Sequence, residues 1–237
     1  MQTPAITLRY FSVLGRAQPL RAALVDAGVA FEDRHVALAE WAELGTDPAF
    51  GGPYQGLPTL TWGEITLGET LPIASFLSRQ LGEYDGCSDG EIARREAINS
   101  NCYIEVLLRV GELIWAGAVY PGADPRHALA VYAPRVLQKL AAVEAQLTGA
   151  WLCGPRPGLA DFFACESLAA LRKVLGPERD ARLRSRLPRL FDHSSVLARR
   201  PNLARSPPRR PANFTSHPDE PAILALLASA DLEAAGL

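Results

Sequence analysis

The chain has 237 residues, enough for one large domain or two of ordinary size. Its composition, 48% hydrophobic and 21% charged, is typical of a globular protein with a buried core, and no apolar run reaches the roughly 18 residues of a membrane helix. A formal net charge of −2 argues against a nucleic acid or an anionic membrane as the partner of the whole chain. No secretion signal is visible after Met1, so we expect a cytoplasmic protein.

The N-terminal part of the chain alternates between strand and helix signals. We expect strands at residues 5–10, 31–36, 58–62 and 65–67, and helices at residues 17–27, 40–44 and 70–81. Gly28 is expected to end the first long helix and Thr70 to cap the last, while the rest of residues 39–54 reads as irregular. A β-α-β segment followed by β-β-α predicts a small α/β sandwich over residues 1–82.

Beyond a polar, glycine-bearing linker at residues 82–90, the strand signal disappears. The apolar spacing predicts helices at residues 91–118, 126–147, 161–175, 179–186, 188–199 and 222–235. Pro134 predicts a kink or a later start of its helix, and the proline-rich run at residues 206–211 excludes a regular helix there. Residues 90–237 are therefore expected to form an all-helical domain.

Tyr10 closes the first predicted strand and is followed by a Ser-Gly loop and a helix with Pro19 in its first turn. This arrangement presents one tyrosine hydroxyl at the mouth of a loop. Ser12, in the same loop, offers a second hydroxyl as an alternative. Both are candidates for a polar contact with a ligand, although a terminal-strand tyrosine is also a common packed aromatic.

Two further motifs suit a small peptide. If the Leu57–Pro58 bond is cis, the backbone of Leu57 turns outward and can pair with an extended peptide, as in strand addition. Glu69 and Thr70 stand at a helix start, where free N–H groups and the helix dipole favour a carboxylate, while Glu69 favours an ammonium. Together they predict a site for an amino-acid zwitterion.

With these motifs in this order, the chain resembles a cytosolic glutathione transferase of the tyrosine type, nearest to the sigma and mu classes. The resemblance covers almost the whole chain. It rests on Tyr10, on residues 15–21 (Gly-Arg-Ala-Gln-Pro-Leu-Arg), on Leu57-Pro58, on residues 67–70 (Leu-Gly-Glu-Thr) with Ile73-Ala74, and on Gly154 with Ala160-Asp161. It implies a thioredoxin-like N-terminal domain with a cis-proline, an all-α C-terminal domain, and glutathione as co-substrate without a metal.

The resemblance also implies residue roles. Tyr10 would be the catalytic residue that stabilises the glutathione thiolate. The residues that would bind glutathione are Arg16, Trp41, Gly56, Leu57, Pro58, Glu69 and Thr70. An apolar electrophile would be held between the domains, near Phe11, Val13, Leu14, Arg109 and Trp115. Two of these roles stay open: Trp41 is either an indole donor or a packed aromatic, and Arg16, like Arg21, is also interpretable as a tie to a neighbouring carboxylate.

The strength of a single hydrogen bond is enough to support this mechanism. A free thiol has a pKa of about 8.5, and a hydrogen bond to a charged acceptor contributes about 1.5–3 kcal/mol, which lowers that pKa by roughly one to two units. We therefore expect conjugation of the glutathione thiolate to a small apolar electrophile, the chemistry of detoxification. The alternatives are glutathione-dependent isomerisation or peroxide reduction on the same fold, or a binding protein of this fold without catalysis.

The remaining residues refine these expectations. The family predicts a homodimer, for which Phe50 or Tyr54 is a candidate contact. The chain departs from the family pattern in four places. Gly56 replaces an amide side chain, and Glu69-Thr70 replaces the commoner Gln-Ser or Glu-Ser with the hydroxyl retained. No lysine stands within a few residues after Trp41, and Gly158 replaces a helix-capping hydroxyl. The four cysteines show no metal-ligand spacing, and none lies in the N-terminal domain. The four histidines show no nucleophile–base pattern and are expected to have surface or loop roles.

Overall fold

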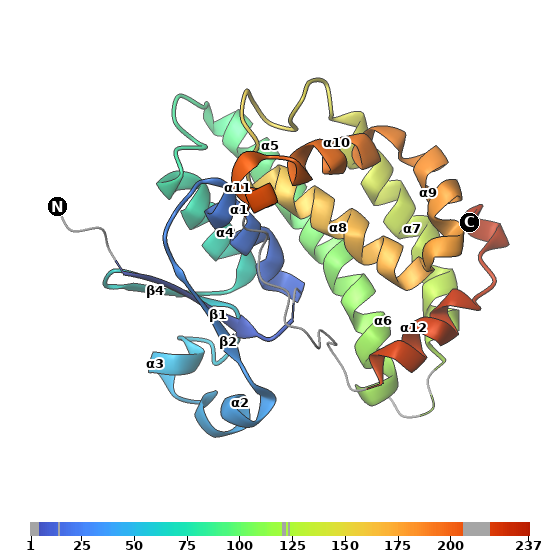
Figure 1. Cartoon of the computed structure of the whole chain (residues 1–237), viewed down its shortest axis with the longest axis horizontal. Coiled ribbons are helices and arrows are strands. Elements are labelled where there is room, and N and C mark those ends of the chain that lie inside the picture. The colour runs from blue at the N-terminus through green and yellow to red at the C-terminus, as the bar shows by residue number, and fades with distance from the viewer. Residues whose placement is uncertain (1–4, 14, 120–121, 123, 206–218) are drawn as a thin grey trace. The chain divides into compact units, whose positions relative to one another are not determined.

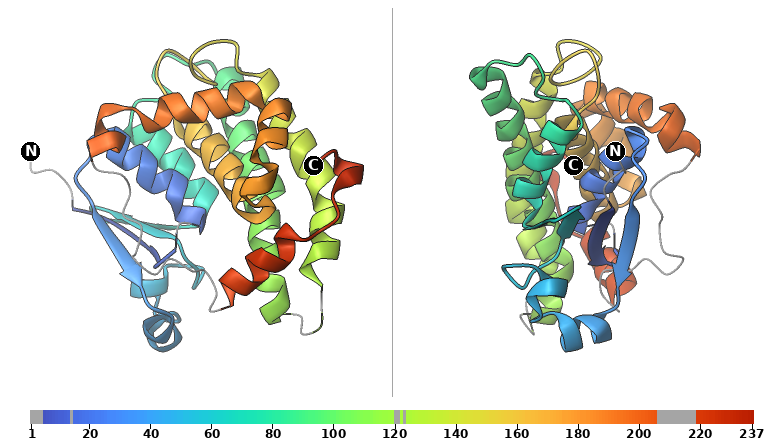
Figure 2. Two further views of the ribbon diagram at one scale, coloured as in Figure 1. Left: turned by 45° about the vertical axis from the view of Figure 1, so that its right-hand side comes forward. Right: turned by 90° about the vertical axis from the view of Figure 1, so that its left-hand side faces the viewer.

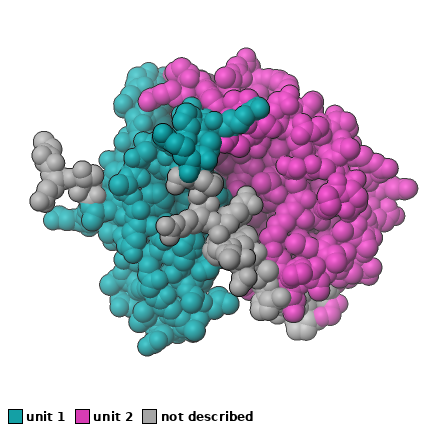
Figure 3. All heavy atoms as spheres, in the orientation of Figure 1, with its two compact units in different colours: residues 1–88, 199–214 teal, residues 89–198, 215–237 magenta. Residues whose placement is uncertain are grey.

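The structure, a computed structural model, describes residues 5–13, 15–119, 122, 124–205 and 219–237. The chain divides into two compact units, coloured separately in Figure 3. Unit 1 comprises residues 1–88 and 199–214, and unit 2 comprises residues 89–198 and 215–237. Residues 199–205, expected in the helical domain, group with the N-terminal unit.

Unit 1 is built on a four-stranded mixed sheet with the strand order β2-β1-β3-β4 (Figure 1). Its strands are β1 (Ile6–Phe11), β2 (Glu32–Val36), β3 (Thr59–Trp62) and β4 (Ile65–Gly68). β1 and β2 are parallel and joined through a helix, whereas β3 runs antiparallel to both β1 and β4. The predicted β-α-β and β-β-α segments are confirmed, in the thioredoxin-like order.

Four helices accompany the sheet in the N-terminal part of unit 1, and α1 follows a 3-10 turn, η1 (Gly15–Ala17). They are α1 (Gln18–Asp26), α2 (Leu38–Leu44), α3 (Pro48–Gly51) and α4 (Thr70–Gln80). Gly28, with φ 69°, follows α1 as predicted. α3 lies in a stretch that was predicted to be irregular. The helix forms there because Asp47 caps its start by accepting the Ala49 N–H at 2.8 Å. The prediction that Thr70 caps α4 is wrong: Glu69 is the N-cap and Thr70 is the first helical residue.

Residues 199–205 join unit 1 through the end of α1. The short helix α11 (Pro201–Arg205) packs beside α1. The Asn202 side chain donates to the Asp26 carbonyl at 2.8 Å, and Arg200 forms an ion pair with the Asp26 carboxylate at 2.5 Å. Because the last carbonyls of a helix lack partners within the helix, the Asn202 bond satisfies a group that α1 itself leaves open.

The described part of unit 2 contains helices and the segments that join them but no strand, and α6, α7 and α8 pack against one another within it (Figure 2). Its helices are α5 (Asp89–Ser100), α6 (Leu108–Val119), α7 (Pro125–Ala145), α8 (Leu159–Leu175), α9 (Asp180–Arg186), α10 (Pro188–Ala198) and α12 (Glu220–Ala228). A π-helical turn, η2 (Asn101–Leu107), joins α5 to α6, and 3-10 turns follow at η3 (Pro177–Arg179) and η4 (Glu233–Ala235). Pro134 lies inside α7, so the predicted later start of that helix is wrong. Among the described residues, no helix combines the length and apolar character needed to cross a membrane.

The C-terminal tail is anchored to unit 2 by side chains that bond its open carbonyls. The predicted single helix at 222–235 is divided, because α12 ends at Ala228 and η4 begins at Glu233. Arg179 donates to the carbonyls of Ala228 and Ala230 at 2.8 and 2.7 Å.

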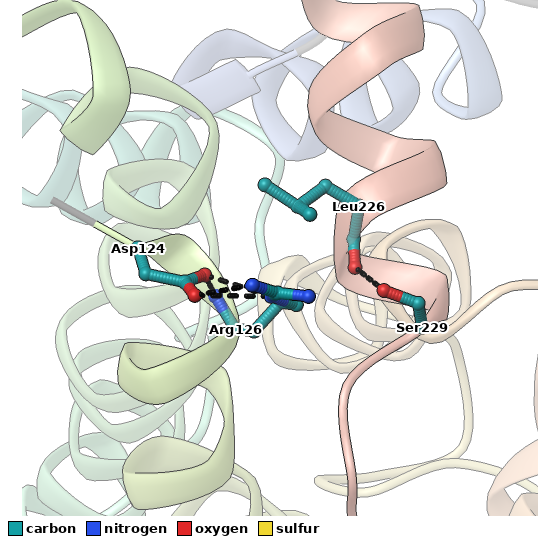
Figure 4. Close-up of polar contacts among 4 residues, drawn as sticks. All are labelled: Asp124, Arg126, Leu226 and Ser229. Atoms are coloured by element: carbon teal, nitrogen blue, oxygen red, sulfur yellow. Dashed lines mark hydrogen bonds and ion pairs between the residues drawn. The ribbon is translucent and has the colours of Figure 1, made fainter. Parts of the chain in front are cut away.

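Figure 4 shows a second polar group beside the tail, at the start of α7. Asp124 caps α7 by accepting the Arg126 N–H at 2.9 Å, and its carboxylate also pairs with the Arg126 side chain. These bonds hold the pKa of the Asp124 carboxyl below its usual value. Ser229 donates to the Leu226 carbonyl at 2.7 Å and closes the end of α12. The proline-rich run at residues 206–211 lies outside the described residues.

Candidate active site

The strand register brings the predicted site motifs to one end of the sheet in unit 1. Thr59 of β3 lies opposite Arg9 of β1 and opposite Gly68 of β4. β1 and β4 run in the same direction and β3 runs against both. The residues that follow Arg9, precede Thr59 and follow Gly68 therefore share one sheet end. This end carries the motifs of Tyr10, Leu57–Pro58 and Glu69–Thr70.

Tyr10 lies on the buried face of β1, with only 7% of its surface exposed. The backbone N–H of Arg16 donates to its hydroxyl oxygen at 3.2 Å. A hydroxyl that accepts one hydrogen bond becomes a stronger donor in another, because hydrogen bonds in a chain polarise one another. The arrangement suits a tyrosine that donates to an anion.

Gly15 makes this arrangement sterically possible. Its φ is +42°, a conformation that favours glycine, and a Cβ placed there would lie 2.7 Å from the Tyr10 hydroxyl oxygen. Only a residue without a side chain lets the backbone approach the hydroxyl so closely. The glycine of the sequence motif thus has a spatial reason at this site.

The Leu57–Pro58 peptide bond is cis, as the sequence analysis supposes. Leu57 lies two residues before Thr59, the first residue of β3 and the partner of Arg9 on β1. Gly56, which replaces the amide side chain of the family pattern, is half-buried, and a Cβ built on it would meet only the Tyr54 carbonyl, at 3.7 Å. A Cβ at position 56 would therefore make only an ordinary van der Waals contact.

Glu69 and Thr70 start α4 in an unusual conformation. Glu69 adopts φ 68° and ψ 133°, which costs a non-glycine residue about 1–3 kcal/mol. Thr70 is 1% exposed, and within the described structure its hydroxyl oxygen has no hydrogen-bond partner. Strained backbone and an unpaired buried hydroxyl at the N-terminus of an 11-residue helix favour an anionic ligand group.

Trp41, on α2, packs as an aromatic residue against the same part of unit 1. Its ring lies edge-on to Phe11 at 5.6 Å between centroids. A Cβ on Gly51 would approach the Trp41 ring to 3.4 Å. Trp41 thus packs against Phe11, and its indole N–H as a glutathione donor stays a prediction.

The other predicted residues are divided between the two units. Phe11 and Val13 lie in unit 1, and Leu14 lies outside the described residues. Arg109 and Trp115 lie on α6 of unit 2, where Arg109 pairs with Glu112 at 3.2 Å and Trp115 is 38% exposed. Their role with an electrophile stays a prediction. Arg16 contributes its backbone N–H to Tyr10, while the residue itself is exposed.

Burial keeps two of the three cysteines of unit 2, Cys102 and Cys165, in the thiol form. Burial raises the pKa of the Cys102 thiol to about 12, and it raises that of the Cys165 thiol as well. Both thiols therefore stay protonated and unreactive at neutral pH. Across the described residues, no group of three or more His, Cys, Asp or Glu side chains is placed to hold a metal ion.

Solved structures share this architecture. No family model matches the sequence. The glutathione S-transferase of Ascaris lumbricoides is 24% identical with a TM-score of 0.72, covering 88% of this chain and 98% of its own. The sigma-class enzyme of Fasciola hepatica is 22% identical with a TM-score of 0.70, covering 86% and 95%. This is the glutathione transferase fold.

Curated sequences agree with the glutathione transferase resemblance. S-crystallin 2 of Enteroctopus dofleini is 32% identical over 105 residues, which is 44% of this chain and 46% of the relative. The class-mu 28 kDa glutathione S-transferase of Schistosoma japonicum is 36% identical over 78 residues, 32% of this chain and 37% of its own. The chain thus spans about half the length of the curated relatives it matches, or less. The predicted resemblance to the sigma and mu classes is confirmed.

Sequence reasoning missed two contributors to the site. It named Arg16 for its side chain, whereas the structure uses the Arg16 N–H. It expected Arg21 to tie α1 to a neighbouring carboxylate, which the ion pair with Asp33 confirms, but it did not place Arg21 beside the Tyr10 ring. Gly15 directly before Arg16 was the available signal, since a glycine in the loop after Tyr10 permits a close backbone approach.

Proposed function

We propose that the protein is a glutathione transferase that conjugates the glutathione thiolate to a small apolar electrophile. The observation that carries the proposal is the Tyr10 hydroxyl, which accepts the Arg16 N–H and is polarised to donate to a sulfur anion. The nucleophile is the sulfur of the co-substrate. The protein binds it, orients it and stabilises its charge.

The remaining motifs would place the peptide around this hydroxyl. Thr70 and the N-terminus of α4 would hold the γ-glutamyl carboxylate, and Glu69 its ammonium. The backbone of Leu57, set by cis-Pro58, would pair with the cysteinyl residue. A cytoplasmic detoxification role belongs to the same proposal.

We also propose a homodimer, with the 69%-exposed Tyr54 as a contact. A structural neighbour from Necator americanus is described as monomeric, with 19% identity, a TM-score of 0.73, and coverage of 90% of this chain and 100% of its own.

The test is a titration of the purified protein with glutathione, followed by the ultraviolet absorbance of the thiolate. S-methylglutathione, which has no ionisable thiol, is the control ligand. We expect bound thiolate near pH 7 and turnover of an activated aryl halide such as 1-chloro-2,4-dinitrobenzene. Absence of glutathione binding would contradict the proposal.

The S-crystallin match favours a second candidate function, a binding protein of this fold without catalysis. The missing amide side chain at Gly56 is consistent with it. This candidate would be supported if glutathione binds with its thiol still protonated and neither electrophiles nor peroxides are turned over. Turnover of peroxides or isomerisable substrates alone would point to the other reactions of the fold.

Replacing Thr70 with valine is expected to weaken glutathione binding. Valine keeps the buried volume and removes the hydroxyl, whose bond to a carboxylate would contribute about 1.5–3 kcal/mol, so KM for glutathione should rise about 10-fold or more with kcat little changed. Initial rates across glutathione concentrations check this. Thr66→Val is the matched control, because Thr66 is an exposed threonine on β4. Equal KM values in the two variants would exclude Thr70 from the site.

Replacing Gly15 with alanine is expected to displace the Tyr10 hydroxyl and lower kcat about 10-fold or more, since misplacing a catalytic group by about 1 Å costs up to about 100-fold. The control is Gly86→Ala. Gly86 has a similarly positive φ of +71°, but a Cβ there meets no atom within 4 Å. Both variants carry the same kind of backbone strain, and Gly15→Ala alone carries the clash. A similar kcat in both would rule out the steric role.

A further inference from the structure

Arg21 is a buried cation that the proposed chemistry leaves unused. It lies on α1 and is 0% exposed, the largest fully buried side chain among the described residues. A buried guanidinium is expensive unless it is paired with a charge and hydrogen-bonded. Its partners therefore indicate what it is there to hold.

Arg21 contacts a carboxylate on β2, a carbonyl in the loop after β1, and the Tyr10 ring. Its Nε donates to the Asp33 carboxylate at 2.8 Å, and one terminal nitrogen donates to the Val13 carbonyl at 2.9 Å. The centre of the guanidinium lies 5.7 Å from the centroid of the Tyr10 ring. One rigid group thus contacts both the tyrosine and the loop that follows it.

Asp33 ties this group to β2 and to a histidine. In the parallel register of β1 and β2, Asp33 lies opposite Leu8 and His35 lies opposite Tyr10. Asp33 and His35 therefore share the sheet face of Tyr10. The second carboxylate oxygen of Asp33 lies 3.2 Å from the His35 Nε2. The carboxylate bridges Arg21 and His35 on that face.

We propose that Arg21, anchored by Asp33, is a positioning residue for the Tyr10 hydroxyl, an inference that rests on the proposed function. Val13 lies in the chain between Tyr10 and Arg16, so a bond to its carbonyl fixes the loop that returns the Arg16 N–H to the tyrosine. The contact between the Arg21 guanidinium and the Tyr10 ring restrains the position of the ring itself. A lysine would keep the charge but not the planar fork that reaches both the carboxylate and the carbonyl.

The experiment compares Arg21→Lys and Asp33→Asn with the wild type. The control is Arg9→Lys: Arg9 is bonded to Thr61 at 3.1 Å and, adjacent to Tyr10 on β1, points to the opposite sheet face. Tyrosine labelled with ¹³C at Cζ gives one resonance for each of the six tyrosines, and Tyr10→Phe identifies that of Tyr10. This readout needs no glutathione. Steady-state kinetics with glutathione and an aryl halide give kcat and KM.

We expect Arg21→Lys and Asp33→Asn to move the Tyr10 resonance and to lower kcat about 10- to 100-fold, with KM for glutathione within about threefold of the wild type. Arg9→Lys should change neither. If the Tyr10 resonance stays in place in the folded variants, the inference is overturned, whatever happens to kcat. A fall in stability alone, with kcat unchanged, overturns it as well.

Two further comparisons separate failure of this inference from unfolding of a variant and from failure of the proposed function. Removing one partner of a buried ion pair costs about 3–5 kcal/mol, so either single variant is at risk of unfolding. The double variant Arg21→Met/Asp33→Leu removes both charges of the Arg21–Asp33 pair and should show the same loss of kcat while remaining folded. Failure of the proposed function itself would show in the wild type, as absent glutathione binding, and not in the variants.

Discussion

Replacing Tyr10 with phenylalanine is expected to abolish most of the bound glutathione thiolate at pH 7 and to lower kcat about 10- to 100-fold. In the proposed function this hydroxyl donates to the sulfur, and a hydrogen bond to a charged acceptor contributes about 1.5–3 kcal/mol. Losing it should raise the pKa of the bound thiol by roughly one to two units, back toward about 8.5. Ultraviolet absorbance of the thiolate, titrated with pH, measures this directly.

Tyr84→Phe is the matched control for this prediction. Tyr84 is also a buried tyrosine of unit 1, at 8% exposure, and the Arg79 guanidinium lies 5.3 Å from its ring, much as Arg21 lies over Tyr10. Phenylalanine keeps the ring packing in both places, so both variants should fold with similar stability. Equal thiolate absorbance in the two would show that Tyr10 is not the activating group and would direct attention to Ser12.

The parts of the fold that sequence reasoning recovered are those governed by local patterns. Alternating burial along β1, the glycine after α1 and the apolar spacing of α4 each follow from a few neighbouring residues. The motif carrying Tyr10 is recognisable in the sequence because a short apolar strand ends near this tyrosine and a loop and a helix start follow. α3 was missed because its start depends on one capping bond of Asp47 within a glycine- and proline-rich stretch.

What sequence reasoning could not supply are contacts between residues far apart in the chain. Asn202 and Arg200 meet Asp26 across most of the sequence, so residues 199–205 were assigned to the helical domain. The Arg16 N–H at the Tyr10 hydroxyl depends on the path of a loop that residue type does not specify. Side-chain pairing in the core is equally invisible, and one such pair leads to the second prediction.

Asp161 and His193 form a buried pair in unit 2, where sequence reasoning expected a surface or loop role for the histidine. Their side chains are 0% and 3% exposed, with Asp161 Oδ1 3.0 Å from His193 Nε2. Asp161 also accepts the backbone N–H groups of Leu152 and Gly158, each at 2.9 Å. The second of these closes the start of α8, where Gly158 has no hydroxyl to offer and the helix forms as expected.

Asp161→Ala is therefore expected to lower the free energy of unfolding by about 3–5 kcal/mol. It leaves the buried N–H groups of Leu152 and Gly158 without an acceptor, at about 1–3 kcal/mol each. Against a total of about 5–15 kcal/mol for a domain, this is enough to unfold unit 2 at moderate temperature. Asp161→Asn, which keeps one acceptor oxygen, should lose less. Denaturant unfolding followed by circular dichroism measures both.

Asp192→Ala supplies the comparison for the stability prediction, because Asp192 is an aspartate of the same unit with an 80%-exposed side chain and only a 3.7 Å contact with Arg184. An exposed ion pair of this kind contributes about 0–1 kcal/mol to stability. The denaturant midpoint of Asp192→Ala should therefore stay close to that of the wild type. The contrast separates loss of a carboxylate in general from loss of the buried acceptor at the start of α8. If Asp161→Ala unfolds at the same denaturant concentration as Asp192→Ala, the N–H groups of Leu152 and Gly158 have other partners once the carboxylate is gone. The buried pair would then contribute to the geometry of α8 without being needed for its stability.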